Sequence, residues 1–406
     1  MGKHRQLLLP ALSLASLASL AIAQAGGVDP KLAAKADAGD AGAQLALAMA
    51  YERGQAAPQD YGQAAQWLKK SAAQGLAAAQ FELAYLYRHG LGVAHDDAIA
   101  VALYLQAAEM GLPAAEFNLG LLYEHGEGVA RDDAQAASWY QKAASHGVAQ
   151  AEGNLGSLYL AGRGVTQDAD EAAKWFGKAA EAGDAEAQYN LALLYRRGNG
   201  LAQDDSQAAA WYRKAADQGL APAQNGLGAL YEHGIGVAQD FAAAALWYGK
   251  AAAQGLAEAQ FNLALRYSLG QGVAHDDARA GELFLAAAKQ GFDRAENNLG
   301  TLYEHGLGVP QDFALAAQWY RKAAEQGHAG AEFNLGRLYS MGRGVAQDDA
   351  EAWFWFNASA QASAGAQRER AEQARNEVEQ RLSQAEIARL RERSKQLLAT
   401  RAPAGS

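Results

Sequence analysis

The residues that could do chemistry in this chain are histidines and paired aspartates, and both recur at fixed steps. Histidines occupy one recurring position, at His89, His125, His233 and His305. A row of histidines can suggest a metal site. Neighbouring members of the row stand at least one 36-residue unit apart, whereas a shared ion needs ligand bonds of roughly 2 Å. We therefore expect exposed histidines at helix ends and no metal site.

The aspartate pairs invite a second chemical interpretation, because paired carboxylates can perform acid–base work. Each pair stands where a helix is expected to begin, and a carboxylate there caps the free N–H groups and favours the positive helix end. Calcium would require a tight loop with six or more oxygen ligands. Helix capping is the interpretation we adopt for Asp96-Asp97, Asp132-Asp133, Asp204-Asp205, Asp276-Asp277 and Asp348-Asp349.

Other chemical classes lack the residues they need. The chain has no cysteine, which excludes disulfides, thiolate zinc sites and a cysteine nucleophile. The recurring Gly-x-Gly-Val segments lack the preceding strand of a nucleotide-binding loop. Tryptophan–tyrosine pairs such as Trp139-Tyr140 resemble a sugar platform, but their strict repetition favours a core position. No polar constellation departs from the repeated pattern, so we expect no enzyme activity and no cofactor.

Composition favours a folded protein that does not bind nucleic acid. The chain has 406 residues with 8 tryptophans and 17 tyrosines, more aromatic residues than a disordered chain carries. The formal net charge is −10. Nucleic-acid binding depends on lysine and arginine neutralising phosphates, so this charge argues against it.

A 36-residue period organises the elements that carry these residues. Nine units of 36 fill residues 40–363 without an insertion, and a period of this length predicts a solenoid. Glycines at Gly54 and every 36th residue after it keep the same step. The tyrosine series that defines the period is Tyr51, Tyr87, Tyr123, Tyr159, Tyr195, Tyr231, Tyr267, Tyr303 and Tyr339.

One unit, residues 115–147, shows why each should be an antiparallel helix pair. Apolar residues from Ala115 to Tyr123 recur at steps of three and four, which is one face of a helix. Gly126 can end that helix in the left-handed conformation. Asp132 or Asp133 then caps a second helix with its own apolar face. We predict an all-α fold, a right-handed α/α solenoid (superhelix) of nine 36-residue helix-turn-helix repeats.

The first 25 residues read as a signal peptide. A positive segment at Lys3–Arg5 precedes an apolar run over residues 7–22, and Ala23-Gln24-Ala25 fits a cleavage site. The alternative, a membrane anchor, needs roughly 20 apolar residues. No cysteine follows that could carry a lipid. We expect cleavage after Ala25, a periplasmic or secreted protein, and no transmembrane segment after cleavage.

The two ends of the repeat array look like caps. Residues 26–39 resemble a second helix without its partner, opened by Asp29 and Pro30. Residues 364–406 carry a net charge of +3, whereas residues 26–363 carry −15. Ser383 and Glu386 form a capping box, so the tail should be two charged helices that close the array.

The repeated unit resembles the Sel-1-like repeat family, a relative of the tetratricopeptide repeat. Its pattern is A-x-x-x-L-G-x-L-Y-x-x-G-x-G-V-x-x-D-x-x-x-A-x-x-W-Y-x-K-A-A-x-x-G, and the resemblance covers residues 40–363. Some bacterial members carry a cysteine pair in each repeat, which is absent here. The resemblance implies an adaptor that binds proteins, with peptidoglycan or polysaccharide nearby.

The candidate partner-binding residues lie where the repeats differ. In the related tetratricopeptide architecture, one position of the first helix would line the concave groove, and it holds five aromatic side chains. Aromatic and amide groups together suit an extended peptide. The alternative is that these residues pack against neighbouring repeats. The groove candidates are Phe81, Phe117, Tyr189, Phe261 and Phe333, with Asn118, Asn190, Asn262 and Asn334 beside them.

Two functional hypotheses follow from the sequence. The first is a non-enzymatic scaffold, monomeric and in the bacterial cell envelope or secreted, that holds a partner protein or peptide. The second is a factor that binds or assembles envelope glycan, either peptidoglycan or exopolysaccharide. Glycan binding predicts exposed, clustered aromatics, whereas protein binding predicts a broader mixed wall.

Overall fold

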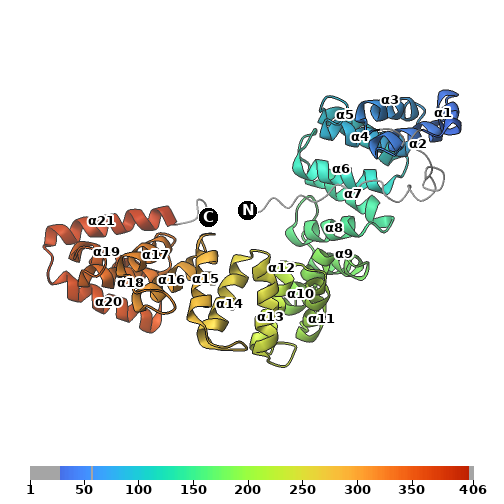
Figure 1. The fold of residues 1–406 in the computed structure, drawn as a ribbon. Coiled ribbons are helices and arrows are strands. Elements are labelled where there is room, and N and C mark those ends of the chain that lie inside the picture. Colours follow the sequence, from blue (N-terminus) through green and yellow to red (C-terminus); the bar gives the residue numbers. More distant parts are fainter. Residues whose placement is uncertain (1–27, 56–57, 402–406) are drawn as a thin grey trace. The chain divides into compact units, whose positions relative to one another are not determined.

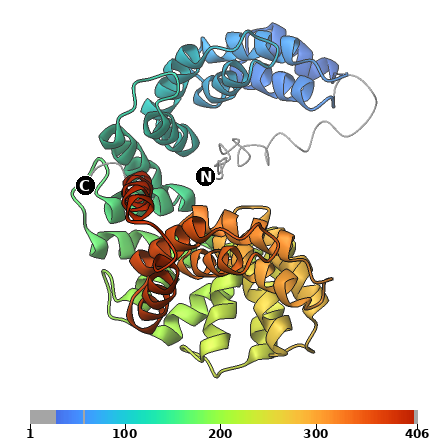
Figure 2. The same ribbon diagram turned by 90° about the vertical axis from the view of Figure 1, so that its left-hand side faces the viewer.

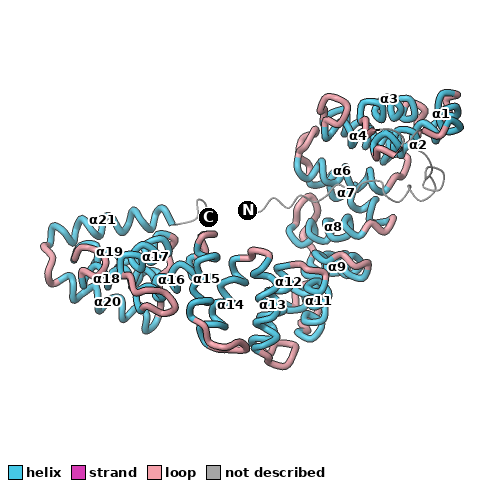
Figure 3. The backbone as a smooth tube through the Cα atoms, in the orientation of Figure 1, coloured by secondary structure: helices cyan, strands magenta, loops and turns pink. Residues whose placement is uncertain are grey.

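The structure is a computed structural model that describes residues 28–55 and 58–401. All regular secondary structure in these ranges is α-helical, as the tube in Figure 3 shows. The expected signal segment, residues 1–25, lies outside the described residues. The prediction of an all-α solenoid of nine helix pairs is confirmed, because α2 to α19 form nine consecutive pairs within residues 41–362.

The helices are labelled in chain order (Figure 1). They are α1 (Pro30–Asp37), α2 (Ala41–Glu52), α3 (Tyr61–Ala72), α4 (Ala77–His89), α5 (Asp97–Glu109), α6 (Pro113–His125), α7 (Asp133–Ser145), α8 (Ala149–Ala161), α9 (Ala169–Glu181), α10 (Ala185–Arg197), α11 (Asp205–Asp217), α12 (Ala221–His233), α13 (Phe241–Ala253), α14 (Ala257–Leu269), α15 (Asp277–Ala288), α16 (Asp293–His305), α17 (Phe313–Glu325), α18 (Ala329–Met341), α19 (Asp349–Ala362), α20 (Gly365–Glu379) and α21 (Gln384–Arg401).

The chain divides into two compact units, residues 1–211 and 212–406, with the boundary inside α11. Within each unit, helices that follow one another along the chain pack side by side. The first helix of each pair is largely covered, whereas the second helix leaves one side exposed to solvent. Side chains on the first helices therefore contact both their own pair and the neighbouring pairs.

Local signals end and begin the helices as the sequence predicts. Asp132 is the cap of α7, and its Oδ1 accepts hydrogen bonds from the N–H groups of Ala134 (2.9 Å) and Gln135 (3.0 Å). The preceding helix α6 ends at Gly126, whose φ of 70° is left-handed. The same aspartate position caps the other second helices, which confirms capping for the first aspartate of each predicted pair. The second aspartate of each pair is the first residue of the helix.

At one recurring position the second helix carries an aromatic ring in eight of the nine pairs and Leu68 in the first, and the matching position of the first helix holds glycine or alanine. A Cβ atom placed on Gly120 of α6 would lie 2.4 Å from the ring of Tyr140 on α7. Tyr140 is fully buried. The pairs Gly156–Phe176, Gly228–Tyr248, Gly300–Tyr320 and Gly336–Phe356 repeat this contact. In these five pairs the helices approach so closely that the ring leaves no room for a Cβ atom, whereas Ala84 and Ala264 occupy the same position beside Tyr104 and Phe284.

A row of buried glutamine and glutamate side chains joins neighbouring pairs. Gln44 Nε2 donates to the carbonyl oxygen of Ala36 at the end of α1 (3.0 Å), and its Oε1 accepts from Gln74 (2.8 Å). Gln224 makes the same two contacts in the second unit, with Ala216 and Gln254. These hydrogen bonds satisfy carbonyl groups at helix ends, which otherwise lack partners. They also fix the position of each first helix against the two second helices beside it.

The last repeat is covered by α20 and α21, the red helices of Figures 1 and 2. Ser383 and Glu386 form the expected capping box, since the N–H of Ser383 donates to Glu386 and the N–H of Glu386 donates to Ser383 Oγ. Ile387 is 2% exposed and packs into the core of the last two repeats. Trp353 of α19 also donates to Glu379 of α20 (2.8 Å). The cap is thus joined to the array by apolar and polar contacts.

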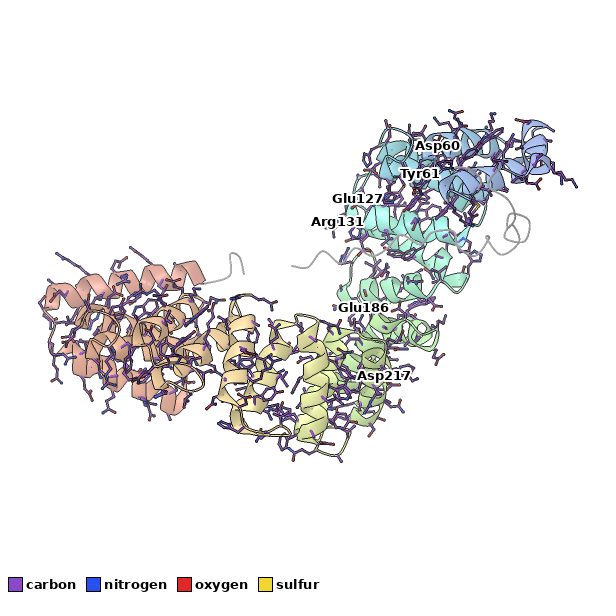
Figure 4. The ribbon with its side chains drawn as sticks, viewed as in Figure 1. Asp60, Tyr61, Glu127, Arg131, Glu186 and Asp217 are labelled. Carbon is purple, nitrogen blue, oxygen red and sulfur yellow. The ribbon has the colours of Figure 1, made fainter. Side chains whose placement is uncertain are left out.

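A loop glycine locks each repeat onto the one before it. Gly92 follows α4 with a φ of 66°, and a Cβ there would lie 2.2 Å from the backbone of Tyr61 at the start of α3 (Figure 4). Gly164 contacts the backbone of Asp133 in the same way. The turn between the two helices of one repeat therefore packs on the first turn of the previous second helix.

We predict that Gly92→Ala destabilises the protein. A left-handed non-glycine residue costs roughly 1–2 kcal/mol, and the overlap with the Tyr61 backbone adds to it. Thermal unfolding followed by circular dichroism measures the effect. Gly177→Ala is the control, because Gly177 lies inside α9 with no atom near its would-be Cβ. That change should leave the midpoint equal or higher, and equal losses in both variants would contradict the interpretation.

Candidate partner-binding surface

The structure separates the five predicted groove aromatics into two groups. Phe81, Phe117 and Phe261 are buried at 0%, 1% and 3% exposure. The expectation that all five line an accessible wall therefore does not hold for these three. Tyr189 and Phe333 are partly exposed.

The reason for the burial is a ring contact inside the repeat. Phe81 packs against Tyr104 with ring centroids 5.3 Å apart, and Phe117 packs against Tyr140 at 5.8 Å. The contacts Phe261–Phe284 and Phe333–Phe356 follow the same scheme at 5.7 Å and 5.4 Å. Side chains at this angle therefore lean toward the second helix of their own pair.

Two of the four predicted asparagines join neighbouring first helices. Asn118 is fully buried, and Asn190, Asn262 and Asn334 are partly exposed. Asn262 Nδ2 donates to Asn225 Oδ1 (3.0 Å), and Asn334 donates to Asn297 in the same way (3.2 Å). Some of the asparagine side-chain groups that we expected to bind a peptide are thus already hydrogen-bonded between repeats.

On α10 a predicted aromatic residue and the asparagine beside it are both partly exposed, and we call this side of the helix the α10 face. It consists of Glu186, Tyr189, Asn190, Leu193 and Arg197, which are spaced at three or four residues and so share one side of the helix. Glu186 (Figure 4) and Arg197 are exposed, and the other three are partly exposed. The face combines an aromatic and an aliphatic side chain, an amide, and charges of both signs.

Five of the tryptophan rings each carry a lysine ammonium group over one face. Lys142 Nζ lies 3.6 Å from the ring centre of Trp139, and Lys250 lies at the same distance from Trp247. Lysines one turn after Trp67, Trp175 and Trp319 make the same contact at 3.8–4.1 Å. A sugar would have to displace these cations before it could stack.

Three repeats carry a cluster in which tyrosine and arginine surround a glutamate, which we call the tyrosine–glutamate–arginine cluster. Tyr140 donates its hydroxyl hydrogen to Glu124 (2.7 Å), and Arg163 pairs with the same carboxylate (3.1 Å). The other two clusters are Tyr248–Glu232–Arg266 and Tyr320–Glu304–Arg337.

The third cluster shows how strongly these donors act. Burial would raise the pKa of Glu304, but the hydrogen bonds from Arg337 and Tyr320 outweigh it, so the pKa is lowered. In the first two clusters the same kinds of donor, a tyrosine hydroxyl and an arginine, contact the carboxylates of Glu124 and Glu232.

The first two repeats lack this cluster, and their glutamates were not among the residues predicted from the sequence. Glu52 occupies the position of Glu124, yet Leu68 replaces the tyrosine and Glu82 stands where six of the seven later repeats have asparagine. Burial raises the pKa of Glu52 to about 7, only partly offset by Arg53. Burial, together with the charge of Glu52, raises the pKa of Glu82 to about 7. A comparison of the 36-residue series position by position would have revealed the substitution.

Two further properties concern only the part of the chain that the structure describes. No group of three or more histidine, aspartate or glutamate side chains there is arranged to hold a metal ion. None of the helices within residues 28–55 and 58–401 combines the length and apolar character that crossing a membrane requires.

Comparison with known proteins places the repeats in a family. Nine consecutive segments match the Sel1 repeat, at residues 41–76, 77–112, 113–148, 149–184, 185–220, 221–256, 257–292, 293–328 and 329–363. The chain belongs to the Sel1 repeat family. Proteins built from Sel1 repeats generally mediate protein–protein interactions, and the fold is in general a non-catalytic scaffold.

Two solved Sel1 structures are similar over most of the chain. A Sel1 repeat protein from Oxalobacter formigenes is 34% identical with a TM-score of 0.61, covering 76% of this chain and 90% of the other. A protective antigen of uropathogenic Escherichia coli with an SLR fold is 32% identical with a TM-score of 0.54, covering 92% and 95%. No match was found among curated proteins.

We predict that the two glutamates of the first two Sel1 repeats make stability depend on pH. Their raised pKa means that the folded protein favours the protonated carboxyls. This contribution is full below the ordinary pKa of 4.5 and is lost as the pH rises through about 7. Glu52→Gln/Glu82→Gln should therefore raise the thermal midpoint at pH 8 and change it little at pH 4.5. An equal shift at both pH values would contradict this.

Proposed function

We propose that this protein is a non-enzymatic scaffold of the bacterial cell envelope, or a secreted one, that binds a segment of a partner protein on its first helices. The observation that carries the proposal is the α10 face. Its aromatic, aliphatic, amide and charged groups are accessible on one side of α10. Most of the buried residues of the repeats, by contrast, recur at the same positions in every unit. Such a mixture supplies an anchor and polar contacts for an extended or helical peptide.

A protein partner is favoured over a glycan. Glycan binding predicts clustered, exposed aromatic rings, but three of the five candidate aromatics are buried and five tryptophan rings are covered by lysine. The acidic repeat region, with a net charge of −15 over residues 26–363, suits a partner with basic groups. It would slow the approach of an acidic polysaccharide.

The first prediction concerns the partner. Captures from an envelope fraction with the full mature chain as bait, quantified by mass spectrometry, should lose at least one protein by about tenfold with Tyr189→Ala/Asn190→Ala, equivalent to roughly 1.4 kcal/mol. Phe117 and Phe261 are unsuitable targets, because removing a buried phenylalanine costs about 3–5 kcal/mol and would report unfolding.

The control for this capture is Lys174→Ala/Glu181→Ala, which removes two exposed side chains from the neighbouring helix α9. It should retain every partner. A capture profile that the Tyr189→Ala/Asn190→Ala variant leaves unchanged would contradict binding at the α10 face.

The second prediction concerns location. The proposal of an envelope or secreted protein rests on the positive segment, apolar run and Ala23-Gln24-Ala25 cleavage pattern. Protein expressed from the full chain in a Gram-negative bacterium should be recovered from the periplasm or medium, with Gly26 as its first residue by N-terminal sequencing. Recovery in the cytoplasm with Met1 retained would refute the secretion proposal.

A further inference from the structure

Charged side chains 39 residues apart form pairs between neighbouring repeats. Glu124 of α6 pairs with Arg163, which follows α8 (3.1 Å). One repeat earlier, the same two positions hold Arg88 and Glu127, which also form an ion pair, with the signs exchanged. Figure 4 shows Glu127 in the loop after α6. In these two repeats a charge at the first position is matched by the opposite charge at the second, whereas Arg196 and Glu232 have Ile235 and Gln271 at the second position.

The first pair of this series is incomplete. Glu52 stands at the position of Glu124, and Leu91 stands at the position of Arg163. The tyrosine that donates to Glu124 is replaced by Leu68, and the facing asparagine by Glu82. The tyrosine and the arginine that pair with Glu124 are therefore both missing here, and a second carboxylate takes the place of the asparagine.

Further polar groups around these two carboxylates lack partners. Glu52 Oε1 is buried without a hydrogen bond among the described residues. The same is true of the Tyr104 hydroxyl, which is fully buried and lies within electrostatic reach of Glu82 and Arg88. Tyr104 lies beside the amide of Asn118, but the two are not aligned for a hydrogen bond. Buried polar groups without partners are rare and call for a ligand or another explanation.

We propose that Glu52 and Glu82 receive the guanidinium group of an arginine that a partner protein supplies. A planar guanidinium has five N–H donors and can satisfy two carboxylates at once. It would occupy the role that Arg163 has beside Glu124. Both glutamates remain partly exposed, so a side chain from outside can reach them. Their own positive neighbour, Arg53, is exposed on the following residue.

This inference rests on the proposed scaffold function and adds the chemistry of one contact. The acidic repeat region would attract a basic segment over a longer distance. The two carboxylates would then select the position of one arginine, since lysine presents a compact point charge in place of a bidentate group. The expected partner is thus a peptide that carries an arginine at one fixed position, while its other residues are selected less strictly.

The experiment measures binding of a short synthetic peptide with two arginines, compared with the same peptide carrying neutral citrulline. Fluorescence polarisation at low ionic strength, with the full mature chain, gives the affinities. The arginine peptide should bind the unchanged protein about tenfold more tightly than it binds Glu52→Gln/Glu82→Gln. The citrulline peptide should bind both weakly and equally.

Two further variants separate a specific contact from general attraction to an acidic protein. Glu109→Gln/Glu181→Gln removes two exposed carboxylates from second helices and should leave arginine-peptide binding within about twofold, because exposed single charges contribute little. Leu91→Arg supplies the missing arginine from the chain itself and should abolish the preference, whereas Leu91→Gln should keep it. Equal losses in both glutamate variants, or no preference for arginine over citrulline, would overturn the proposal.

Failure of this inference is distinguishable from failure of the proposed function. If partners are captured through the α10 face and the glutamate variant binds the arginine peptide as well as the unchanged protein does, the scaffold stands and the arginine receptor falls. If Tyr189→Ala/Asn190→Ala changes no capture while arginine selectivity depends on Glu52 and Glu82, the receptor stands and the α10 face falls.

Discussion

The rest of the repeat depends on one contact, in which an aromatic ring of the second helix packs directly on a small residue of the first helix. Tyr140 on Gly120 brings two helices near enough that Phe117, on the same first helix, must also pack on that ring. The space that an exposed wall of aromatics would occupy is thereby used inside the pair. At Gly120 this close packing leaves no room for an added methyl group.

The tyrosine at that contact also has a polar end, and this links the packing to the charged groups of the first helices. Where the ring is Tyr140, Tyr248 or Tyr320, its hydroxyl donates to a glutamate of the first helix. The arginine then balances the charge. One ring thus supports both the apolar core and a polar cluster, so the loss of the tyrosine at Leu68 affects a carboxylate on a different helix.

Sequence analysis recovered the architecture because the signals that define it are local. Asp132 caps the helix that begins beside it, and Gly126 ends the helix that precedes it, so both are legible from spacing. The burial of Phe117 could not be decided from the sequence, because it depends on the distance between two helices, and residue spacing does not give that distance. The changes at Leu68 and Glu82 are legible in the 36-residue series, but their consequence for Glu52 is not, because the positions that would pair with Glu52 lie 30 and 39 residues away, on α4 and in the loop after it.

The contact of Gly92 with the backbone of Tyr61 bears on how such a chain can change its length during evolution. Turns usually absorb insertions, but this turn is held between two repeats, and one added residue would lift it from its seat. Gain or loss of a single residue in this turn is therefore disfavoured. Duplication or deletion of a whole repeat, by contrast, preserves the contacts between the loop glycines and the preceding repeats. The array should consequently grow and shrink by recombination in steps of one complete unit, which accounts for nine copies of equal length.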